Sequence, residues 1–331
     1  MANYAAMNNT SATELAGWIP EIWADYVYIE HYGQMFTEKF TGPEGSGMPI
    51  IRKTELLDRP GDTINITQLS KLTGSGVTGS STLVGNEEKL SENSITVVPT
   101  IVRHAVSWDK DIQKKSIHEL RTLSQLSLTK WFADKKDQDA WTLMQSTSTG
   151  GFSAVARPVV YAGDATVFEE VELADEFDTT VIKKSVNRLE AANVAPVNIE
   201  GENYYICLIH PYQKYSLQKD TDWVSAQENA NIRGRENPLF TGALGAFGGA
   251  LIFVTTNCTT ENAATSPATP TARAIMLGQE AICVGEAEGM EWNEEVQDYG
   301  FKRGVAVEAA YKYESLRADA LIQIVTSVPT P

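Results

Sequence analysis

Residues Gly61 to Trp108 read GDTINITQLS KLTGSGVTGS STLVGNEEKL SENSITVVPT IVRHAVSW, and this stretch decides the fold. At its start Ile64 and Ile66 alternate with polar residues, and at its end a second alternation runs from Thr100 to Trp108. Alternation with a period of two is typical of β-strands. We therefore expect a strand, a flexible loop and a returning strand.

The loop of this ribbon, from Ser70 to Glu92, is rich in Gly, Ser and Thr and contains few apolar residues. Such a segment cannot bury enough apolar surface to become ordered by itself. It can become ordered by lying on a neighbouring surface or by adding to a neighbouring sheet. The sequence therefore predicts an arm that contacts other subunits, in a protein built for assembly.

A long helix is predicted directly after the ribbon, from Asp109 to about Gln145. No Gly or Pro occurs between Thr100 and Thr149, and apolar residues recur at steps of three and four, as an amphipathic helix requires. An unbroken helix over this range would be roughly 50 Å long, at a rise of about 1.5 Å per residue.

The second half of the predicted helix carries a charged run, Asp134 to Asp139. One interpretation is a solvated helix face with ion pairs between neighbouring turns. The other is a metal site made of three aspartates. Because the interleaved Lys135 and Lys136 would repel a cation, we expect the solvated face and no metal site.

The composition indicates a folded and acidic protein. The chain has 331 residues, of which 42% are hydrophobic and 21% charged, and this length favours two connected domains. The formal net charge of −16 argues against tight binding of nucleic-acid phosphates or of an anionic membrane. The acidity provides solubility, and it would also suit a wall that lies beside DNA without adhering to it.

The cysteines and the N-terminal residues favour a reducing compartment. Cys207, Cys258 and Cys283 are widely spaced and odd in number, which indicates neither a disulfide framework nor a zinc site. We therefore expect the cytosol. Residues 1–13 lack the basic and apolar regions of a secretory signal, and no apolar run is long enough to span a membrane.

The rest of the chain is predicted to mix helices and strands. One helix is expected to begin near Pro20, another to cover about 168–193, and a third to begin at His210 and Pro211. Residues 259–271 are small and include Pro, so they are interpreted as an exposed loop. The expected strands are Val159–Tyr161, Tyr204–Ile209, Leu251–Thr255, Arg273–Leu277, Ala281–Val284, Val305–Tyr313 and Asp319–Val325.

The sequence contains no recognisable constellation of catalytic residues, and neither a nucleophile elbow nor a phosphate-binding loop occurs. The histidines lie in four unrelated segments: His31, His104, His118 and His210. The glycines between Gly245 and Gly249 predict a tight turn, because a strand and not a helix follows them. Glu87–Glu88 and Glu294–Glu295 are interpreted as solvated surface, and Cys207 as a small core residue. We expect no enzyme, cofactor or metal.

One segment has a composition that a purely structural role does not explain. Residues 231–242 read NIRGRENPLFTG, a loop that carries two arginines and then becomes apolar. Arg233 and Arg235 could bind phosphate, or they could meet carboxylates of another subunit in so acidic a chain. The sequence leaves both alternatives open.

Three segments, in this order, resemble those of tailed-bacteriophage major capsid proteins: Pro20–Trp23, Gly61–Ile64 and Asn237–Gly245. The resemblance covers about residues 20–325 and implies an α+β chain with the Hong Kong-type phage capsid fold, whose extended loop would be Thr67–Ile95. The implied parts are an N-terminal arm and first helix (1–60), an extended loop with flanking strands (61–108), a peripheral domain with a spine helix (109–201), a mixed α/β axial domain (202–320) and a C-terminal strand and tail (321–331).

The resemblance implies a structural protein that self-assembles into an icosahedral shell around double-stranded phage DNA. The implied partners are copies of the chain in hexamers and pentamers, scaffolding, portal and decoration proteins, and packaged DNA without tight specific binding. No membrane is implied. The implied locations are the virion and, during assembly, the host cytoplasm.

A nanocompartment shell of the same fold that encloses a protein cargo is the first alternative, and an acidic cytosolic hydrolase is the second. A fibre or accessory protein would show internal repeats, which are absent from this sequence. Some relatives join subunits by a Lys–Asn isopeptide bond, but no motif marks a partner for a lysine of the loop. The residues predicted to contact neighbouring subunits are Lys71, Gly74, Gly79, Glu87, Glu88, Lys89, Arg233 and Arg235.

Overall fold

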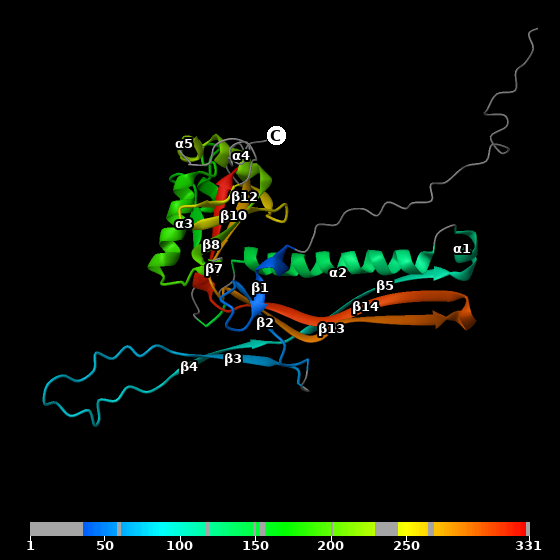
Figure 1. The fold of residues 1–331 in the computed structure, drawn as a ribbon, viewed down its shortest axis with the longest axis horizontal. Coiled ribbons are helices and arrows are strands. Elements are labelled where there is room, and N and C mark those ends of the chain that lie inside the picture. Colours follow the sequence, from blue (N-terminus) through cyan, green and yellow to red (C-terminus); the bar gives the residue numbers. More distant parts are fainter. Residues whose placement is uncertain are drawn as a thin grey trace, which may run out of the picture.

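The structure, a computed structural model, describes residues 36–57, 61–116, 119–147, 150–152, 156–199, 201–228, 244–263 and 268–328. The helix predicted near Pro20, His31, His118 and the segment with Arg233 and Arg235 lie outside the described residues. The described part consists of a long sheet with a helix along it, a second sheet with its own helices, and a narrow ribbon that extends away from both (Figure 1).

The long sheet has five strands in the order β1-β2-β13-β14-β5. Their bounds are β1 (Thr41–Pro43), β2 (Ile50–Lys53), β13 (Ile282–Gln297), β14 (Lys302–Ser315) and β5 (Thr100–Asp109). β13 and β14 form an antiparallel hairpin, and β5 runs antiparallel to β14 with Val106 opposite Val305. The strands predicted at 281–284 and 305–313 are present, and both are longer than expected.

Helix α2 (Leu120–Gln145) packs along one face of this sheet (Figure 1). Val305 and Val307 of β14 are buried there together with Trp108 of β5 and Leu128 of the helix. Residues two apart on a strand share one face, so their neighbours in sequence point to the opposite face of the sheet. The apolar face of the helix and the apolar face of the strands thus pack against each other in one buried layer.

The prediction of one unbroken helix from Asp109 to Gln145 was wrong. A short helix α1 (Lys110–Lys115) ends at Ser116, which is extended, and α2 begins only at Leu120. Because β5 ends at Asp109 and α2 packs back on the same sheet, the chain has to reverse its direction between them. An unbroken helix would run past the end of the sheet and lose this packing, so the helix breaks without a Gly or a Pro.

The extended loop begins as a two-stranded antiparallel ribbon of β3 (Ile64–Leu69) and β4 (Glu92–Val97). Ile66 lies opposite Ile95, in agreement with a loop between Thr67 and Ile95. The prediction that Thr100–Trp108 is the returning strand of this ribbon was wrong, because those residues form β5 in the long sheet. Pro99 lies between β4 and β5. Because Pro has no N–H to donate, it separates the hydrogen bonds of the β3–β4 pair from those of the β14–β5 pair.

The second sheet has eight strands, in the order β6-β15-β12-β8-β10-β9, with β11 paired to β12 and β7 to β8. Their bounds are β6 (Val159–Tyr161), β7 (Val197–Ile199), β8 (Glu202–Ile209), β9 (Ala246–Phe247), β10 (Ala250–Val254), β11 (Thr260–Ala263), β12 (Thr269–Leu277) and β15 (Leu321–Ser327). All the strands predicted in this region are present, with small shifts at their ends. The loop predicted over 259–271 was wrong in part, because its two ends pair with each other as β11 and β12.

Three helices pack with the second sheet: α3 (Thr179–Ala191), α4 (Pro211–Lys219) and α5 (Thr221–Glu228). α4 begins where predicted, because His210 Nδ1 accepts a hydrogen bond from the Tyr212 N–H at 3.2 Å. The helix predicted over 168–193 is shorter than expected, since Asp178 accepts a hydrogen bond from the Val181 N–H at 2.8 Å and so caps the helix start. The short 3-10 helices are η2 (Thr37–Phe40), η3 (Phe168–Glu170), η4 (Asp298–Gly300) and η5 (Ala318–Ala320).

The largest buried cluster lies between the second sheet and its helices, and it includes the last turns of α2. Cys207 is fully buried in this cluster, which confirms its interpretation as a small core residue. Gly248 and Gly249 have positive φ angles and connect β9 to β10, which confirms the predicted tight turn. The second half of α2 therefore belongs to the core that joins the two sheets.

Candidate functional site: surfaces for assembly

The extended loop carries a set of exposed apolar side chains. Their exposed fractions are 64% for Leu69, 54% for Leu72, 62% for Leu83, 79% for Val84 and 69% for Leu90. Figure 1 shows the loop extending away from both sheets. Single exposed leucines are common on protein surfaces, but a group of them on one projecting segment indicates a surface that a partner covers.

One carboxylate organises the middle of this loop. Glu88 accepts hydrogen bonds from the backbone N–H groups of Thr73 and Gly74, both at 2.7 Å, and from the Thr73 hydroxyl at 3.1 Å. The hydrogen bond from the Thr73 backbone is the main reason why the pKa of the Glu88 carboxyl is lowered. Glu88 thus joins the two sides of the loop beyond the end of the β3–β4 ladder, which the interpretation as solvated surface did not foresee.

The described residues that were predicted to contact neighbouring subunits are all exposed and all lie on the loop. They are Lys71, Gly74, Gly79, Glu87, Glu88 and Lys89. The Ser70 N–H donates to the Ser91 carbonyl at 2.8 Å, so Lys71 and Lys89 lie at similar distances from the base of the loop. Arg233 and Arg235 lie outside the described residues.

The base of the loop is anchored in the body of the protein. Ile64 and Val97 are buried in a small cluster with Ile51 and Cys283. A Cβ atom on Gly285 would lie 2.9 Å from Val97 Cγ1 and 3.0 Å from Ile64 Cδ1, closer than normal packing permits. Gly285 therefore lets the ribbon approach β13, and it sets the direction in which the loop leaves the body.

A buried carboxylate joins three distant segments at the end of the long sheet. Asp137 of α2 is 2% exposed, and its Oδ1 accepts hydrogen bonds from the N–H groups of Phe36 (3.1 Å) and Thr37 (2.9 Å) and from the Thr37 hydroxyl (2.7 Å). Its Oδ2 accepts a hydrogen bond from the Asn257 side chain. Asp137 thus holds the start of the described chain and the turn after β10 against the helix.

The interpretation of Asp134–Asp139 as a solvated face was wrong for Asp137. The reason is that this half of α2 enters the core between the two sheets, where only a bonded carboxylate is tolerated. Among the described residues, no group of three or more His, Cys, Asp or Glu side chains could hold a metal ion. The donors to Asp137 are 100 to 120 residues away, so no local signal distinguishes it from Asp134.

A chain of charges lies beside Asp137. Lys136 and Glu286 form an ion pair at 2.5 Å, with side chains 13% and 16% exposed, and Glu286 lies 3.7 Å from Arg52, which also pairs with Glu38. These residues come from α2, β13, β2 and η2. The chain of charges links the helix to two strands of the long sheet.

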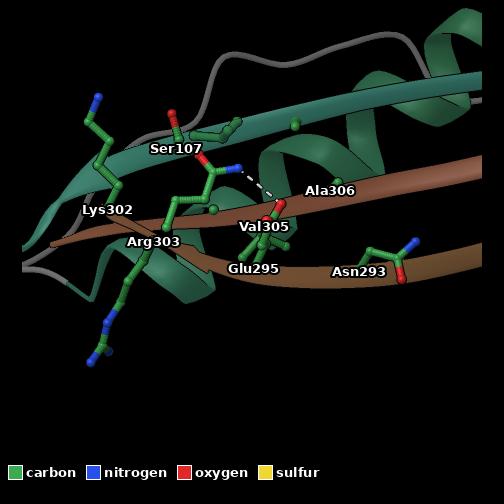
Figure 2. Close-up of a pocket in the computed structure, with 11 residues that line it drawn as sticks. Ser107, Asn293, Glu295, Lys302, Arg303, Val305 and Ala306 are labelled. Carbon is green, nitrogen blue, oxygen red and sulfur yellow. Dashed lines mark hydrogen bonds between the residues drawn. The ribbon is translucent and has the colours of Figure 1, made fainter. Parts of the chain in front are cut away.

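The face of the long sheet opposite α2 has a shallow groove with a floor of small residues. Ala105 lies opposite Ala306 and Ser107 opposite Gly304, and the groove has a volume of about 320 Å³. Figure 2 shows Ser107, Ala306 and Asn293 on three adjacent strands of this face. The groove is too open for a buried small-molecule site, and it suits an extended segment of another chain.

The described side chains do not form a reactive centre. Burial raises the pKa of the Cys207 thiol and that of the Cys283 thiol to about 12, so neither is a nucleophile at neutral pH. His104 packs on Trp131, with 4.5 Å between the ring centroids, and His210 caps α4. No helix in the described part of the chain is long and apolar enough to cross a membrane.

Comparison with known proteins agrees with this absence of reactive chemistry. The phage capsid protein family matches residues 7–320 of the chain. The chain belongs to this family. This capsid protein is similar to the major capsid protein of Pseudomonas phage KPP25, with 24% identity over 344 aligned positions that cover 92% of this chain and 89% of that protein.

Solved structures show the same fold. The capsid of Ralstonia phage GP4 matches with a TM-score of 0.75 and 25% identity, over 94% of this chain and 96% of that one. The capsid of cyanophage Pam1 matches with a TM-score of 0.83 and 16% identity, over 99% of this chain and 100% of that one. The prediction of an α+β chain with the Hong Kong-type capsid fold is confirmed.

The capsid protein is a structural protein and not an enzyme, because its family and its relatives are structural capsid proteins. It is the phage major capsid protein, and copies of it form the icosahedral shell of the virion. The hydrolase alternative is therefore excluded. The surfaces described above are where the contacts between copies have to be sought.

Proposed function

We propose that this capsid protein encloses double-stranded phage DNA in a shell of hexamers and pentamers, and that its extended loop lies on a neighbouring copy. The observation that supports this most is the group of apolar side chains on the loop, each more than half exposed. A projecting segment without a core gains order only from a partner surface. In a shell made of one protein, that surface belongs to a neighbouring copy.

Many weak contacts suffice for such a shell. Each copy offers the loop, the groove on the long sheet and the surfaces of the second sheet, so that every subunit is held by several neighbours. The residues proposed to contact the neighbour through the loop are Lys71, Gly74, Gly79, Glu87, Glu88 and Lys89. Arg233 and Arg235 stay predicted contacts with another subunit.

The charge of the protein suits a container for DNA. With a net charge of −16, the inner wall of a shell would repel packaged phosphates, so that DNA packs without adhering. We propose that DNA is bound neither tightly nor specifically, and that scaffolding, portal and decoration proteins take part in assembly. Assembly would take place in the host cytoplasm, with the finished shell in the virion.

The division of the chain into parts 1–60, 61–108, 109–201, 202–320 and 321–331 stays a prediction. The sheets cross these boundaries, because β14 of the proposed axial part pairs with β13 on one side and with β5 of the extended-loop part on the other. We propose that the peripheral domain in the assembled shell consists of α2 together with these three strands. The second sheet and α3 to α5 would then form the axial domain.

Electron microscopy and analysis of the particle contents test the proposal. Particles purified from infected cells should be closed and icosahedral, and they should protect double-stranded DNA from nuclease. Mass spectrometry that found an enzyme cargo and no DNA would favour a nanocompartment instead. A chain that stays monomeric at high concentration, with and without the other phage proteins, would contradict the proposal.

A further inference from the structure

The turn between β13 and β14 holds an aromatic side chain out into solvent. Tyr299 is 109% exposed relative to the free residue, and Val296 and Phe301 beside it are 62% and 45% exposed. The turn is tied to the start of α1, because the Lys110 N–H donates to the Phe301 carbonyl at 2.8 Å. The aromatic side chain is thus presented from a fixed end of the long hairpin.

The backbone of this turn is strained. Three consecutive residues have left-handed φ angles, 51° for Asp298, 50° for Tyr299 and 90° for Gly300. This conformation suits Gly and is unfavourable for a bulky side chain such as Tyr. Strain of this kind is typically retained where it serves a contact or a site. The turn therefore maintains an exposed tyrosine at a position where a glycine or an asparagine would be more stable.

A pocket of about 310 Å³ lies at the same end of the hairpin. Among the residues that line it are Trp108, Gln113, Glu119, Arg121, Val296 and Arg303. The volume is at the low end of the range of roughly 300–1,000 Å³ seen for small-molecule sites, which leaves room for one aromatic side chain. Arg121 is fixed in the wall by hydrogen bonds to Glu294 at 2.9 and 2.5 Å.

Trp108 gives this pocket an unused hydrogen-bond donor. Its side chain is buried, with 9% exposure, and its Nε1–H has no acceptor within the described chain. Buried indole N–H groups usually have a partner, since an unpaired one costs free energy. The nitrogen itself is shielded from water, so an acceptor reaches it only when side chains that line the pocket move aside.

The charges around the turn match those around the pocket. Asp298 and Lys302, which flank Tyr299, form no ion pair within the described residues, and neither does Arg303 of the pocket. Arg303 and Glu119 both line the pocket, so an entering turn finds an opposite charge for the Asp298 carboxylate and another for Lys302. Both approaches are attractive, and such complementarity fixes the register of a contact.

We propose that Tyr299 of each copy enters the pocket of a neighbouring copy, where its hydroxyl oxygen accepts a hydrogen bond from Trp108 Nε1. The proposal rests on the proposed function, because it needs a shell in which hairpin ends of different copies meet. Turn and pocket are different surfaces at one end of the same subunit, so the contact is heterologous. It closes into a small ring when the rotation between copies closes.

A pair of introduced cysteines tests whether Tyr299 of one copy lies close to the pocket of another copy. One variant carries Tyr299→Cys and a second carries Gln113→Cys, and the two are co-assembled, so that a disulfide between the introduced thiols can form only between copies. The native cysteines are buried and should stay reduced. We expect a cross-linked dimer on a non-reducing gel of oxidised particles, and none from particles of either variant alone. Intact particles without this dimer would overturn the proposal.

A double-mutant cycle tests the hydrogen bond itself. Tyr299→Phe and Trp108→Phe should each raise the protein concentration needed for assembly by about 2- to 10-fold, and the double variant should be no worse than Trp108→Phe alone. Tyr299→Ala should have a larger effect, whereas Tyr215→Ala, an exposed tyrosine on α4, should have none. Additive effects of the two Phe variants, or normal assembly of Tyr299→Ala, would refute the contact.

These outcomes separate the inference from the function on which it rests. If the wild-type chain forms no particles under any condition, the proposed function fails and this contact falls with it. If particles form normally while the cross-link is missing and the coupling is zero, only the contact between Tyr299 and Trp108 is wrong. Circular dichroism of each variant checks that the subunit remains folded.

Discussion

The Oδ1 atom of Asp137 accepts two hydrogen bonds from Thr37, one from its backbone N–H at 2.9 Å and one from its hydroxyl at 2.7 Å. Asp137 is 2% exposed and Thr37 is 1% exposed. The bonds fix the point at which the N-terminal part of the described chain meets α2. A buried carboxylate with several donors is tolerated because of those donors, and removing it leaves the donors unpaired.

Replacing this carboxylate should therefore destabilise the subunit strongly. Asp137→Ala leaves the N–H groups of Phe36 and Thr37 without their acceptor, and it should lower the free energy of unfolding by about 3 kcal/mol. Urea unfolding of unassembled subunits measures this change. Asp134→Ala, in the same helix, is the control and should cost less than about 0.5 kcal/mol. Equal losses for the two variants would show that Asp137 has no special role.

Shortening the extended loop should separate folding from assembly. Deletion of Gly74 to Gly85 removes residues that bury little apolar surface in the subunit, so the far-ultraviolet circular dichroism spectrum should keep its helix signal. The deletion also removes the exposed Leu83 and Val84, so sedimentation should show fewer closed particles. The full-length variant Leu83→Ser with Val84→Ser is the control for loop length, and it should also assemble poorly. Loss of the helix signal would contradict the independence of the loop.

Local patterns in the sequence are sufficient to predict the extended loop and most strands of the second sheet. The alternation around Ile66 and Ile95, with a Gly- and Ser-rich stretch between them, specifies a ribbon with a coreless tip. The pair His210 and Pro211 specifies a helix start, because Pro is tolerated in the first turn. In each case the determining interactions lie within a few residues of each other or across one hairpin.

Features that depend on distant partners could not be predicted. The pairing of Val106 with Val305 places β5 in the long sheet. Nothing in the sequence near Val106 specifies that β5 pairs with a strand about 200 residues away and not with the nearby β3–β4 ribbon. The break at Ser116 follows from the reversal that packs α2 on that sheet, not from a helix-breaking residue. The trapped donor of Trp108 and the strained turn at Tyr299 likewise become visible only once the hairpin is in place.

The middle of the extended loop should loosen in acid. Its Glu88 carboxyl has a lowered pKa, chiefly because of the hydrogen bond from the Thr73 backbone, so the ionised form stabilises the folded loop. This contribution is present above the ordinary pKa of a Glu carboxyl, about 4.3, and is lost as the pH falls through the lowered folded-state value. Hydrogen exchange of unassembled subunits, corrected for intrinsic rates, should show less protection of the Thr73 and Gly74 amides in acid than at neutral pH.

A neutral side chain at this position should abolish the pH dependence. Glu88→Gln should show the low protection of Thr73 and Gly74 at every pH, because an amide oxygen is a weaker acceptor than a carboxylate. Glu92→Gln is the matched control, an exposed strand residue that does not bond to the loop amides, and it should behave like the wild type. Protection in Glu88→Gln that still falls with pH would mean that another group controls the loop.

The packing of Gly285 beneath the base of the loop should make this position intolerant of even one methyl group. A Cβ atom there would lie 2.9 Å from Val97 Cγ1 and 3.0 Å from Ile64 Cδ1, both on buried side chains that have little room to move. Gly285→Ala should therefore lower the free energy of unfolding by about 1–3 kcal/mol. Gly289→Ala, in the same strand with nothing near its Cβ position, should not destabilise the protein. Because both substitutions remove the same backbone freedom from β13, the difference between their urea midpoints isolates the contact with the ribbon. Equal midpoints would mean that the residues at the base of the loop move apart without loss of stability. Gly285 would then not set the direction of the extended loop.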